Sequence, residues 1–248
     1  MRVSIFMAVA VASLLAAGCK DKGTGNQVAA PFAPVAAVAA PNGGDWTQTV
    51  SITPEGGYRM GNPDAPVKLV EYASYTCPHC AEFSKEATQK LESDYVKSGR
   101  ISWEFRPFQL FPTDLGISLL VRCQGADASF LLAEQLYATQ RDWVGKLQSL
   151  SEDEQKTFNA MPPQQRVGAL VRAAGLDQFF RQRGMPEGRM QSCLADEQGI
   201  ETILGITDRG SKQFNVTGTP TFFINGQKVE DVAGWQLLEP QLKRAVGA

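Results

Sequence analysis

The chain has 248 residues, of which 43% are hydrophobic and 20% are charged, a composition that is ordinary for a globular protein. Its formal net charge is −2 and it contains no run rich in lysine or arginine, so the sequence excludes a nucleic-acid-binding function driven by charge. The length is enough for one sizeable core and a subdomain.

The N-terminal residues have the pattern of an export signal. Arg2 is followed by an apolar run over residues 3–17 that is too short to cross a bilayer comfortably, so we expect residues 1–18 to be a signal peptide. The run ends in Gly18-Cys19, which resembles a bacterial lipobox and predicts lipidation of Cys19 and a membrane anchor. The alternatives are ordinary cleavage and an uncleaved anchor. In each case we expect a protein of the periplasm or cell envelope.

A low-complexity segment follows the signal. Residues 19–45 are rich in Ala, Pro, Gly and Asn and hold no helical or strand period, which predicts a tether rather than a domain. Residues 46–52 and 58–60 are the first segments that favour β-strands, the earlier one at a sheet edge.

The stretch that best indicates chemistry is Cys77-Pro78-His79-Cys80, the single CxxC of the sequence, which also contains its one histidine. The apolar, β-type residues 67–72 lead into it, and a helix-type pattern over 78–97 begins at its proline. Residues 101–108 then favour another strand, so the order is β, α, β with a crossover long enough for two parallel strands. This context indicates a redox-active pair of thiols.

Helix geometry predicts that Cys77 is the nucleophile. Pro78 suits the first helical position because its φ is fixed and it has no N–H, which leaves Cys77 as the N-cap. The sulfur there faces the unpaired backbone N–H groups of His79 and Cys80 and the positive end of the helix dipole. Both lower the pKa of a thiol. The His79 imidazole can add a hydrogen bond or, when protonated, a charge.

Cys80 has a different environment in this prediction. It lies one turn into the helix and begins an apolar stripe that continues through Phe83, Ala87 and Leu91. A shielded resolving thiol beside an exposed nucleophile is what thiol–disulfide exchange requires. Because a stabilised thiolate stabilises the reduced form, we expect an oxidising pair.

At this point the chain resembles the DsbA family of thioredoxin-fold thiol–disulfide oxidoreductases, whose motif is Cys-Pro-His-Cys. The family has an acidic residue six positions before the first cysteine, and Glu71 occupies that position. It also has a cis-proline that faces the redox pair before a late strand, and Thr219-Pro220 ahead of residues 221–226 resembles it. The resemblance extends over roughly residues 58–246 and rests on a fairly specific combination of motifs.

The resemblance implies an α/β protein with a thioredoxin fold and an inserted α-helical subdomain. The implied catalytic residues are Cys77, Cys80, His79, Pro78 and Glu71, and the implied substrate-binding residues are Thr219 and Pro220. In this context we expect Glu71 to be a proton acceptor that serves Cys80.

The sequence departs from the family pattern in two places. The family's namesake has a lysine near the acidic residue on the following strand, whereas this chain offers Glu104 or Arg106 there. Thr219 stands before the proline, which is more typical of the isomerase and reductase branches than the valine of the strongest oxidase. How the charge of Glu71 is offset, and the direction of electron flow, stay open at this point.

The expected organisation places the thioredoxin fold in two segments of the chain, residues 46–112 and 200–248, around an insertion over 113–199. Helices of the insertion are expected at 113–124, 127–140, 164–174 and 187–196, with a further helix start capped by Ser151 and Glu154. Its expected core side chains are Leu119, Leu120, Phe130, Leu131, Leu132 and Leu136. A helix over 201–213, a hairpin turn at Asn225-Gly226 and a closing helix over 235–246 complete the fold.

The remaining cysteines fit an exported protein. Setting Cys19 aside for lipid leaves Cys77, Cys80, Cys123 and Cys193, and the last two are a candidate structural disulfide in an oxidising compartment. The alternative is two buried free thiols.

The expected function is an exported thiol–disulfide oxidase that donates the Cys77–Cys80 disulfide to cysteine-containing secreted proteins, without a bound cofactor or metal. The resemblance implies reoxidation by a membrane quinone-linked partner. One alternative is a reductase or isomerase kept reduced by a membrane electron donor. A zinc site is a second, but it lacks another CxxC to complete four ligands. A binding module or chaperone is a third, and it would leave Pro78 and Thr219-Pro220 without a purpose.

Overall fold

The computed structural model describes residues 34–247. The expected signal peptide, the lipidation site Cys19 and the tether as far as residue 33 lie outside the described residues. Among the helices that the structure describes, none has the length and apolar character needed to cross a bilayer.

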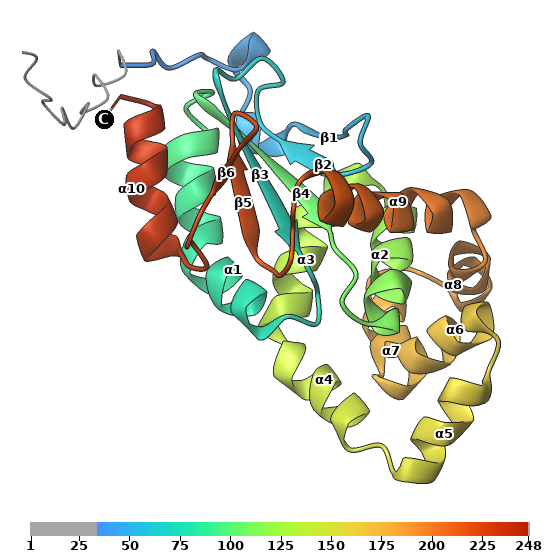
Figure 1. Cartoon of the computed structure of the whole chain (residues 1–248). Coiled ribbons are helices and arrows are strands. Elements are labelled where there is room, and N and C mark those ends of the chain that lie inside the picture. Colours follow the sequence, from blue (N-terminus) through green and yellow to red (C-terminus); the bar gives the residue numbers. More distant parts are fainter. Residues whose placement is uncertain (1–33, 248) are drawn as a thin grey trace, which may run out of the picture. The chain divides into compact units, whose positions relative to one another are not determined.

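Within residues 34–247, six strands form one mixed sheet in the order β1-β2-β4-β3-β5-β6 (Figure 1). The strands are β1 Val50–Ile52, β2 Tyr58–Met60, β3 Val67–Ala73, β4 Ile101–Pro107, β5 Thr221–Ile224 and β6 Gln227–Val229. Strands β3 and β4 are parallel, and the other neighbours are antiparallel. The carboxyl ends of β3 and β4 and the amino end of β5 therefore meet at one end of the sheet.

Helices cover both faces of this sheet (Figure 1). Helix α1 (Pro78–Lys90), extended by a π-helical turn over Leu91–Val96, connects β3 to β4. The other helices are α2 Pro112–Gln124, α3 Ser129–Ala138, α4 Gln140–Gln148, α5 Glu152–Ala160, α6 Pro163–Ala173, α7 Leu176–Arg181, α8 Glu187–Leu194, α9 Glu197–Gln213 and α10 Trp235–Ala245. The run of helices from α2 to α8 separates β4 from α9 along the chain.

The alternation of side chains along the strands divides the core in two. Leu69 and Phe222 face the larger cluster, where the ring of Phe83 on α1 lies 4.7 Å from that of Phe222. Tyr72 faces the opposite side and packs with Ile206 of α9 in a smaller cluster. The predicted α/β thioredoxin fold with helices inserted into it is confirmed.

The start of the described chain differs from the sequence expectation. Residues 46–52 are only partly a strand, because Trp46–Gln48 forms a 3₁₀-helical turn capped by the carboxylate of Asp45. The described part of the expected tether, residues 34–45, packs against the domain. The backbone N–H of Val35 donates to the carbonyl of Val246 at 3.0 Å, and that of Val38 donates to Ser98 at 2.9 Å.

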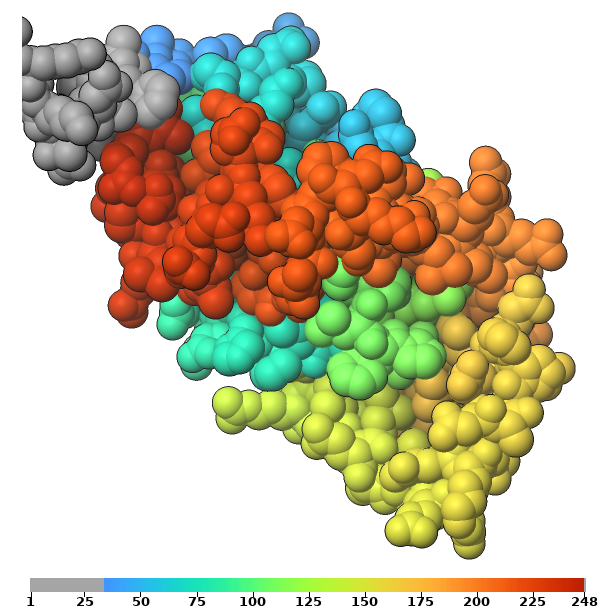
Figure 2. Space-filling view, viewed as in Figure 1, coloured from blue at the N-terminus to red at the C-terminus, as the bar shows by residue number. Residues whose placement is uncertain are grey.

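The helices between β4 and α9 were only partly expected. Helices α4, α5 and α7 are additional to the four ranges predicted, although the Ser151 and Glu154 capping box at the start of α5 is confirmed. Helix α5 buries no residue, and the yellow residues around it lie at the opposite end of the described part from the red α10 (Figure 2). The prediction that Leu131 is a core residue is wrong: it is 57% exposed, because α3 buries only one side.

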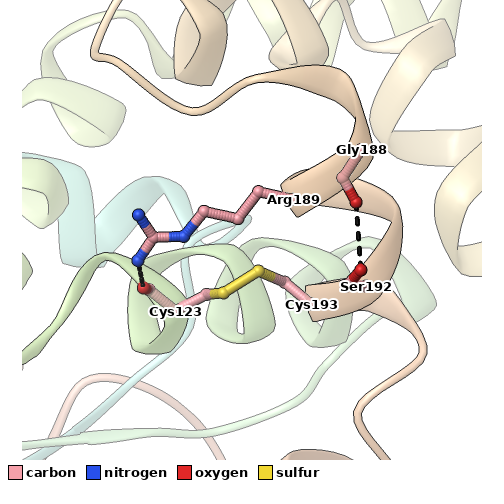
Figure 3. Close-up of a disulfide and its surroundings, with 5 residues drawn as sticks. All are labelled: Cys123, Gly188, Arg189, Ser192 and Cys193. Carbon is pink, nitrogen blue, oxygen red and sulfur yellow. Dashed lines mark hydrogen bonds between the residues drawn. A yellow bond between two sulfur atoms is a disulfide. The ribbon is translucent and has the colours of Figure 1, made fainter.

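A disulfide joins two of the helices of this region. Cys123 at the end of α2 is bonded to Cys193 of α8, with 5.9 Å between their Cα atoms (Figure 3). The guanidinium of Arg189 donates a hydrogen bond to the carbonyl of Cys123 at 2.6 Å beside the bridge. The chain between the two cysteines contains α3 to α7, so the bridge closes the loop that these helices form.

We expect the Cys123→Ser, Cys193→Ser double variant to lose about 4 kcal/mol of unfolding free energy, because closing 70 residues restricts the unfolded chain. For a chain of this length the corresponding fall in Tm is roughly 8–16 °C. Circular dichroism during heating measures it, with both proteins in a Cys77→Ser, Cys80→Ser background that removes the other thiols. An unchanged Tm would contradict a stabilising role for the bridge.

Candidate active site

The loop between β3 and α1 carries the candidate nucleophile. Cys77 has an extended backbone, with φ −77° and ψ 121°, and is the N-cap of α1, while Pro78 occupies the first helical position. The Cys77 side chain is largely buried, and as a thiol its Sγ donates to the carbonyl oxygen of Thr219 at 3.2 Å. The expected helix start at Pro78 is therefore confirmed.

The surroundings of Cys77 favour its thiolate. The pKa of Cys77 is lowered to about 5, first by a hydrogen bond from the Cys80 thiol and further by the backbone N–H groups of Cys80 and His79. Burial opposes this shift but does not cancel it. At neutral pH the reduced site therefore holds a sulfur anion at the amino end of α1.

Cys80 lies in the opposite kind of environment. It is fully buried, and Phe83, Ala87 and Leu91 continue the buried stripe as the sequence predicts. Burial raises the pKa of Cys80 well above the ordinary thiol value, and the neighbouring Cys77 and Glu71 add to that effect. The pKa values of the two sulfurs therefore differ as those of a nucleophile and a resolving thiol should. The expected difference in exposure is wrong, because Cys77 contacts the Thr219 segment and is only 5% exposed.

The Thr219-Pro220 segment lies against the redox pair. The peptide bond between them is cis, as the family resemblance implies, and Thr219 contributes the carbonyl that the Cys77 thiol contacts. Strand β5 begins at the next residue and pairs with β3, with Tyr72 opposite Thr221. The ladder between β3 and β5 thus holds the proline beside the nucleophile.

His79 lies on the outer side of α1. Its side chain is exposed and forms no hydrogen bond with other residues in 34–247, so its described contribution to Cys77 comes from the backbone N–H. The structure thus brings together Cys77, Cys80, Glu71, Thr219 and Pro220, with His79 and Pro78 at the rim.

Glu71 is buried near the end of β3, and its partner was not foreseen. Its carboxylate Oε2 accepts a hydrogen bond of 3.0 Å from the indole N–H of Trp103 on β4. Neither Glu104 nor Arg106 takes the place of the family's lysine. Arg106 instead binds Glu104 on the other face of the sheet, with a shortest N–O distance of 2.7 Å, and donates to the hydroxyl of Tyr72.

A buried carboxylate that the sequence analysis missed organises the rim of the site. Asp114, on the first turn of α2, accepts hydrogen bonds from the Ser74 hydroxyl and from both the backbone and hydroxyl of Thr76. Its other donors are the backbone N–H groups of Leu110 and Phe111. One side chain thus fixes the loop after β3 to the loop after β4. The available signal was an acidic residue in the first turn of a helix that begins at Pro112.

The start of α4 also holds the loop that carries Cys77. The amide Nε2 of Gln140 is buried and donates to the carbonyls of Tyr75 at 2.7 Å and Cys77 at 2.8 Å. The hydroxyl of Tyr137 on α3 donates to the carbonyl of Ser74 at 3.1 Å. These contacts join residues that are far apart in the sequence, so no local sequence pattern predicts them.

Comparisons with known proteins agree with this geometry. The family model described as Thioredoxin matches residues 53–244. A crystal structure of a protein-disulfide isomerase from Novosphingobium aromaticivorans superposes with a TM-score of 0.74 at 30% identity, covering 77% of this chain and 97% of that one. The crystal structure of Wolbachia pipientis alpha-DsbA1 gives a TM-score of 0.60 at 21% identity, covering 79% of this chain and 92% of that one, which supports the fold alone.

A protein from Rickettsia bellii that is provisionally named a protein-disulfide oxidoreductase is 30% identical over 175 residues. The match covers 69% of this chain and 58% of the Rickettsia protein. The chain thus spans little more than half the length of that relative.

We expect the ultraviolet absorbance of the thiolate to titrate in the reduced protein with a midpoint near the Cys77 pKa of about 5. In Cys80→Ala the midpoint should rise, because the largest cause of the low pKa is removed. Since the folded-state pKa lies below the roughly 8.5 of an unfolded thiol, the stability that this group contributes is complete above about pH 8.5 and is lost as the pH falls through about 5. A wild-type midpoint near 8.5 would contradict the proposed nucleophile.

Proposed function

Because the chain belongs to the thioredoxin family and has the fold of DsbA-type proteins, we propose that it is an exported protein thiol–disulfide oxidoreductase that acts as an oxidase. The observation that carries this proposal is the pair of unlike thiols. The pKa of Cys77 is lowered to about 5 at a helix N-terminus, whereas burial raises that of Cys80.

The proposed reaction begins with the Cys77–Cys80 disulfide. A substrate thiolate attacks the sulfur of Cys77, and Cys80 leaves and takes a proton, for which buried Glu71 is the proposed donor. The substrate's second thiolate then attacks the substrate sulfur that is bonded to Cys77, which releases Cys77 as a thiolate. The substrate leaves with a new disulfide, and the two electrons stay on the enzyme as a dithiol. The low pKa of Cys77 favours this direction because it makes Cys77 a good leaving group.

Substrates are proposed to be exported proteins with cysteines that have not yet paired. Leu110 and Phe111 support this substrate class because they are 42% and 61% exposed on the loop that Asp114 ties to Thr76, next to Cys77. Exposed apolar side chains on a loop tied to the residue before Cys77 suit incompletely folded chains, which expose their own apolar residues. Thr219 and Pro220 would hold the mixed disulfide.

Location and partners belong to the same proposal. A signal over residues 1–18 and a lipid on Cys19 would place the enzyme in the periplasm or cell envelope on a membrane anchor. Reoxidation by a membrane quinone-linked protein would complete the cycle, as the family resemblance implies.

A reductase or isomerase role is the second candidate. Thr219 before the cis-proline and the name of the Novosphingobium structure, a protein-disulfide isomerase, favour it. In that case a membrane electron donor would keep Cys77 and Cys80 reduced.

We expect Cys80→Ser to accumulate mixed disulfides with exported proteins, because the Cys77 thiolate attacks a substrate disulfide, one substrate thiolate leaves, and no Cys80 thiol is present to release the adduct. Cys77→Ser, the matched control, should trap none. The adducts are measured by non-reducing electrophoresis after acid quench and identified by mass spectrometry. Equal trapping by both variants, or by neither, would contradict the assigned roles.

The redox state of the site in intact cells distinguishes the two candidate directions. For an oxidase we expect Cys77 and Cys80 to be mostly a disulfide, because reoxidation is fast relative to substrate use. Acid quench followed by alkylation with a mass-tagged reagent measures the ratio of disulfide to dithiol at Cys77 and Cys80. The Cys77→Ser, Cys80→Ser variant, which lacks both thiols, gives the background labelling. A mostly reduced pair would favour the reductase or isomerase.

A further inference from the structure

Glu71 is held by an unusual partner for a buried carboxylate. Among residues 34–247 it accepts one side-chain hydrogen bond, the 3.0 Å bond from the Trp103 indole N–H to Oε2. No lysine or arginine in the same range forms an ion pair with it. The neutral indole N–H of Trp103 therefore stabilises the ionised Glu71 carboxylate, where a cation would be expected.

The strand register explains why no cation reaches Glu71. In the parallel β3–β4 ladder Glu71 lies opposite Phe105 and Tyr72 lies opposite Arg106. Successive side chains point to opposite faces, so Arg106 lies on the Tyr72 face. There it interacts with Glu104, the Tyr72 hydroxyl and Glu55.

Trp103 is itself held firmly in place. It is 5% exposed, it lies opposite Leu69 in the β3–β4 ladder, and its ring packs at 4.8 Å on that of Phe130 from α3. A side chain packed on both sides has little freedom to turn, so its N–H points at a fixed place. That place is one oxygen of Glu71.

We propose that Trp103 is a positioning residue of the redox site, whose indole N–H occupies Oε2 of Glu71 and so leaves Oε1 to exchange a proton with Cys80. This inference rests on the proposed function. When a reduced site reacts with a small disulfide, Cys77 first forms a mixed disulfide and one outside thiolate leaves. Glu71 then takes the proton of Cys80, the Cys80 sulfur attacks Cys77, and the bond to the outside sulfur breaks. Cys77 and Cys80 are oxidised, and the small disulfide is reduced to two thiols.

The charge balance at Glu71 agrees with this role. Burial raises the pKa of Glu71 to about 8 and the nearby Cys77 adds to the rise, while the Trp103 hydrogen bond lowers it. The carboxyl is therefore mostly protonated at neutral pH and can donate to a leaving Cys80, yet it can still ionise to accept the proton in the reverse step. Without the indole N–H the ionised form loses its one side-chain donor, so the pKa should rise further.

The test is the pH dependence of disulfide closure. Reduced protein is mixed with oxidised glutathione, quenched with acid at intervals, and the Cys77–glutathione adduct and the closed Cys77–Cys80 disulfide are separated by mass spectrometry. In the wild type we expect the closure rate to rise with a midpoint at or below the Glu71 pKa of about 8, because Cys77 carries no charge in the adduct and no longer adds to the rise. In Trp103→Phe the midpoint should move up by about one pH unit or more.

Two controls separate positioning from packing. Trp143→Phe removes an indole that is equally buried and donates to the carbonyl of Leu136 at 2.9 Å, so it loses the same kind of bond away from Glu71. Its closure midpoint should not move. In Glu71→Gln the midpoint should vanish, and adding Trp103→Phe to that variant should change the profile no further.

A measurement on the unaltered tryptophan covers the case in which Trp103→Phe does not fold. The indole N–H resonance of Trp103 in the wild type, followed by NMR, should shift with the Glu71 midpoint and should not shift in Glu71→Gln. A Trp103→Phe midpoint equal to the wild type, a midpoint that persists in Glu71→Gln, or an indole resonance that does not titrate would each overturn the positioning role. If wild-type Cys77 forms no adduct with oxidised glutathione at all, the proposed function itself is wrong.

Discussion

The site depends on one sulfur atom at the amino end of a helix that is anchored in the core. Cys77 lies where α1 has backbone N–H groups without intrahelical partners, and Pro78 fixes the chain direction at that point. Phe83, Ala87 and Leu91 bury the inner face of α1, so the helix cannot move away from the sheet without exposing its core. The packing of these side chains, one to four helical turns from Cys77, therefore fixes the position of the backbone N–H groups that stabilise the thiolate.

The opposite properties of the two cysteines come from a separation of one helical turn. Cys77 at the N-cap is within reach of backbone donors and the Thr219 segment, whereas Cys80 already faces the apolar stripe. The same three-residue spacing brings the sulfurs close enough for the Cys80 thiol to be the largest cause of the low pKa of Cys77. Each cysteine thus shifts the other, and neither environment would be the same alone.

The sequence was sufficient for those parts of the site that depend on local geometry. The N-cap position of Cys77, the burial of Cys80 and the cis peptide at Pro220 follow from the CxxC spacing, the proline and the family likeness. The sequence could not predict that Trp103 is the partner of Glu71, because this contact depends on the β3–β4 register. A shift of one residue would replace Trp103 by a residue of the other face. Gln140 was equally hidden, since it reaches the Cys77 loop from another helix. Helix α5 buries no side chain, and the sequence marked only its start, through the cap formed by Ser151 and Glu154.

Asp114 places the whole rim of the site under the control of one side chain. Its two oxygens serve the backbone N–H groups of Thr76, Leu110 and Phe111 together with the hydroxyls of Ser74 and Thr76. The Thr76 amide uses Oδ1 and the Leu110 and Phe111 amides use Oδ2 of the same carboxylate, so a displacement of the Asp114 side chain weakens all three bonds. The loops after β3 and β4 therefore behave as a single cooperative unit in local opening, and their exchangeable hydrogens should be protected or released together.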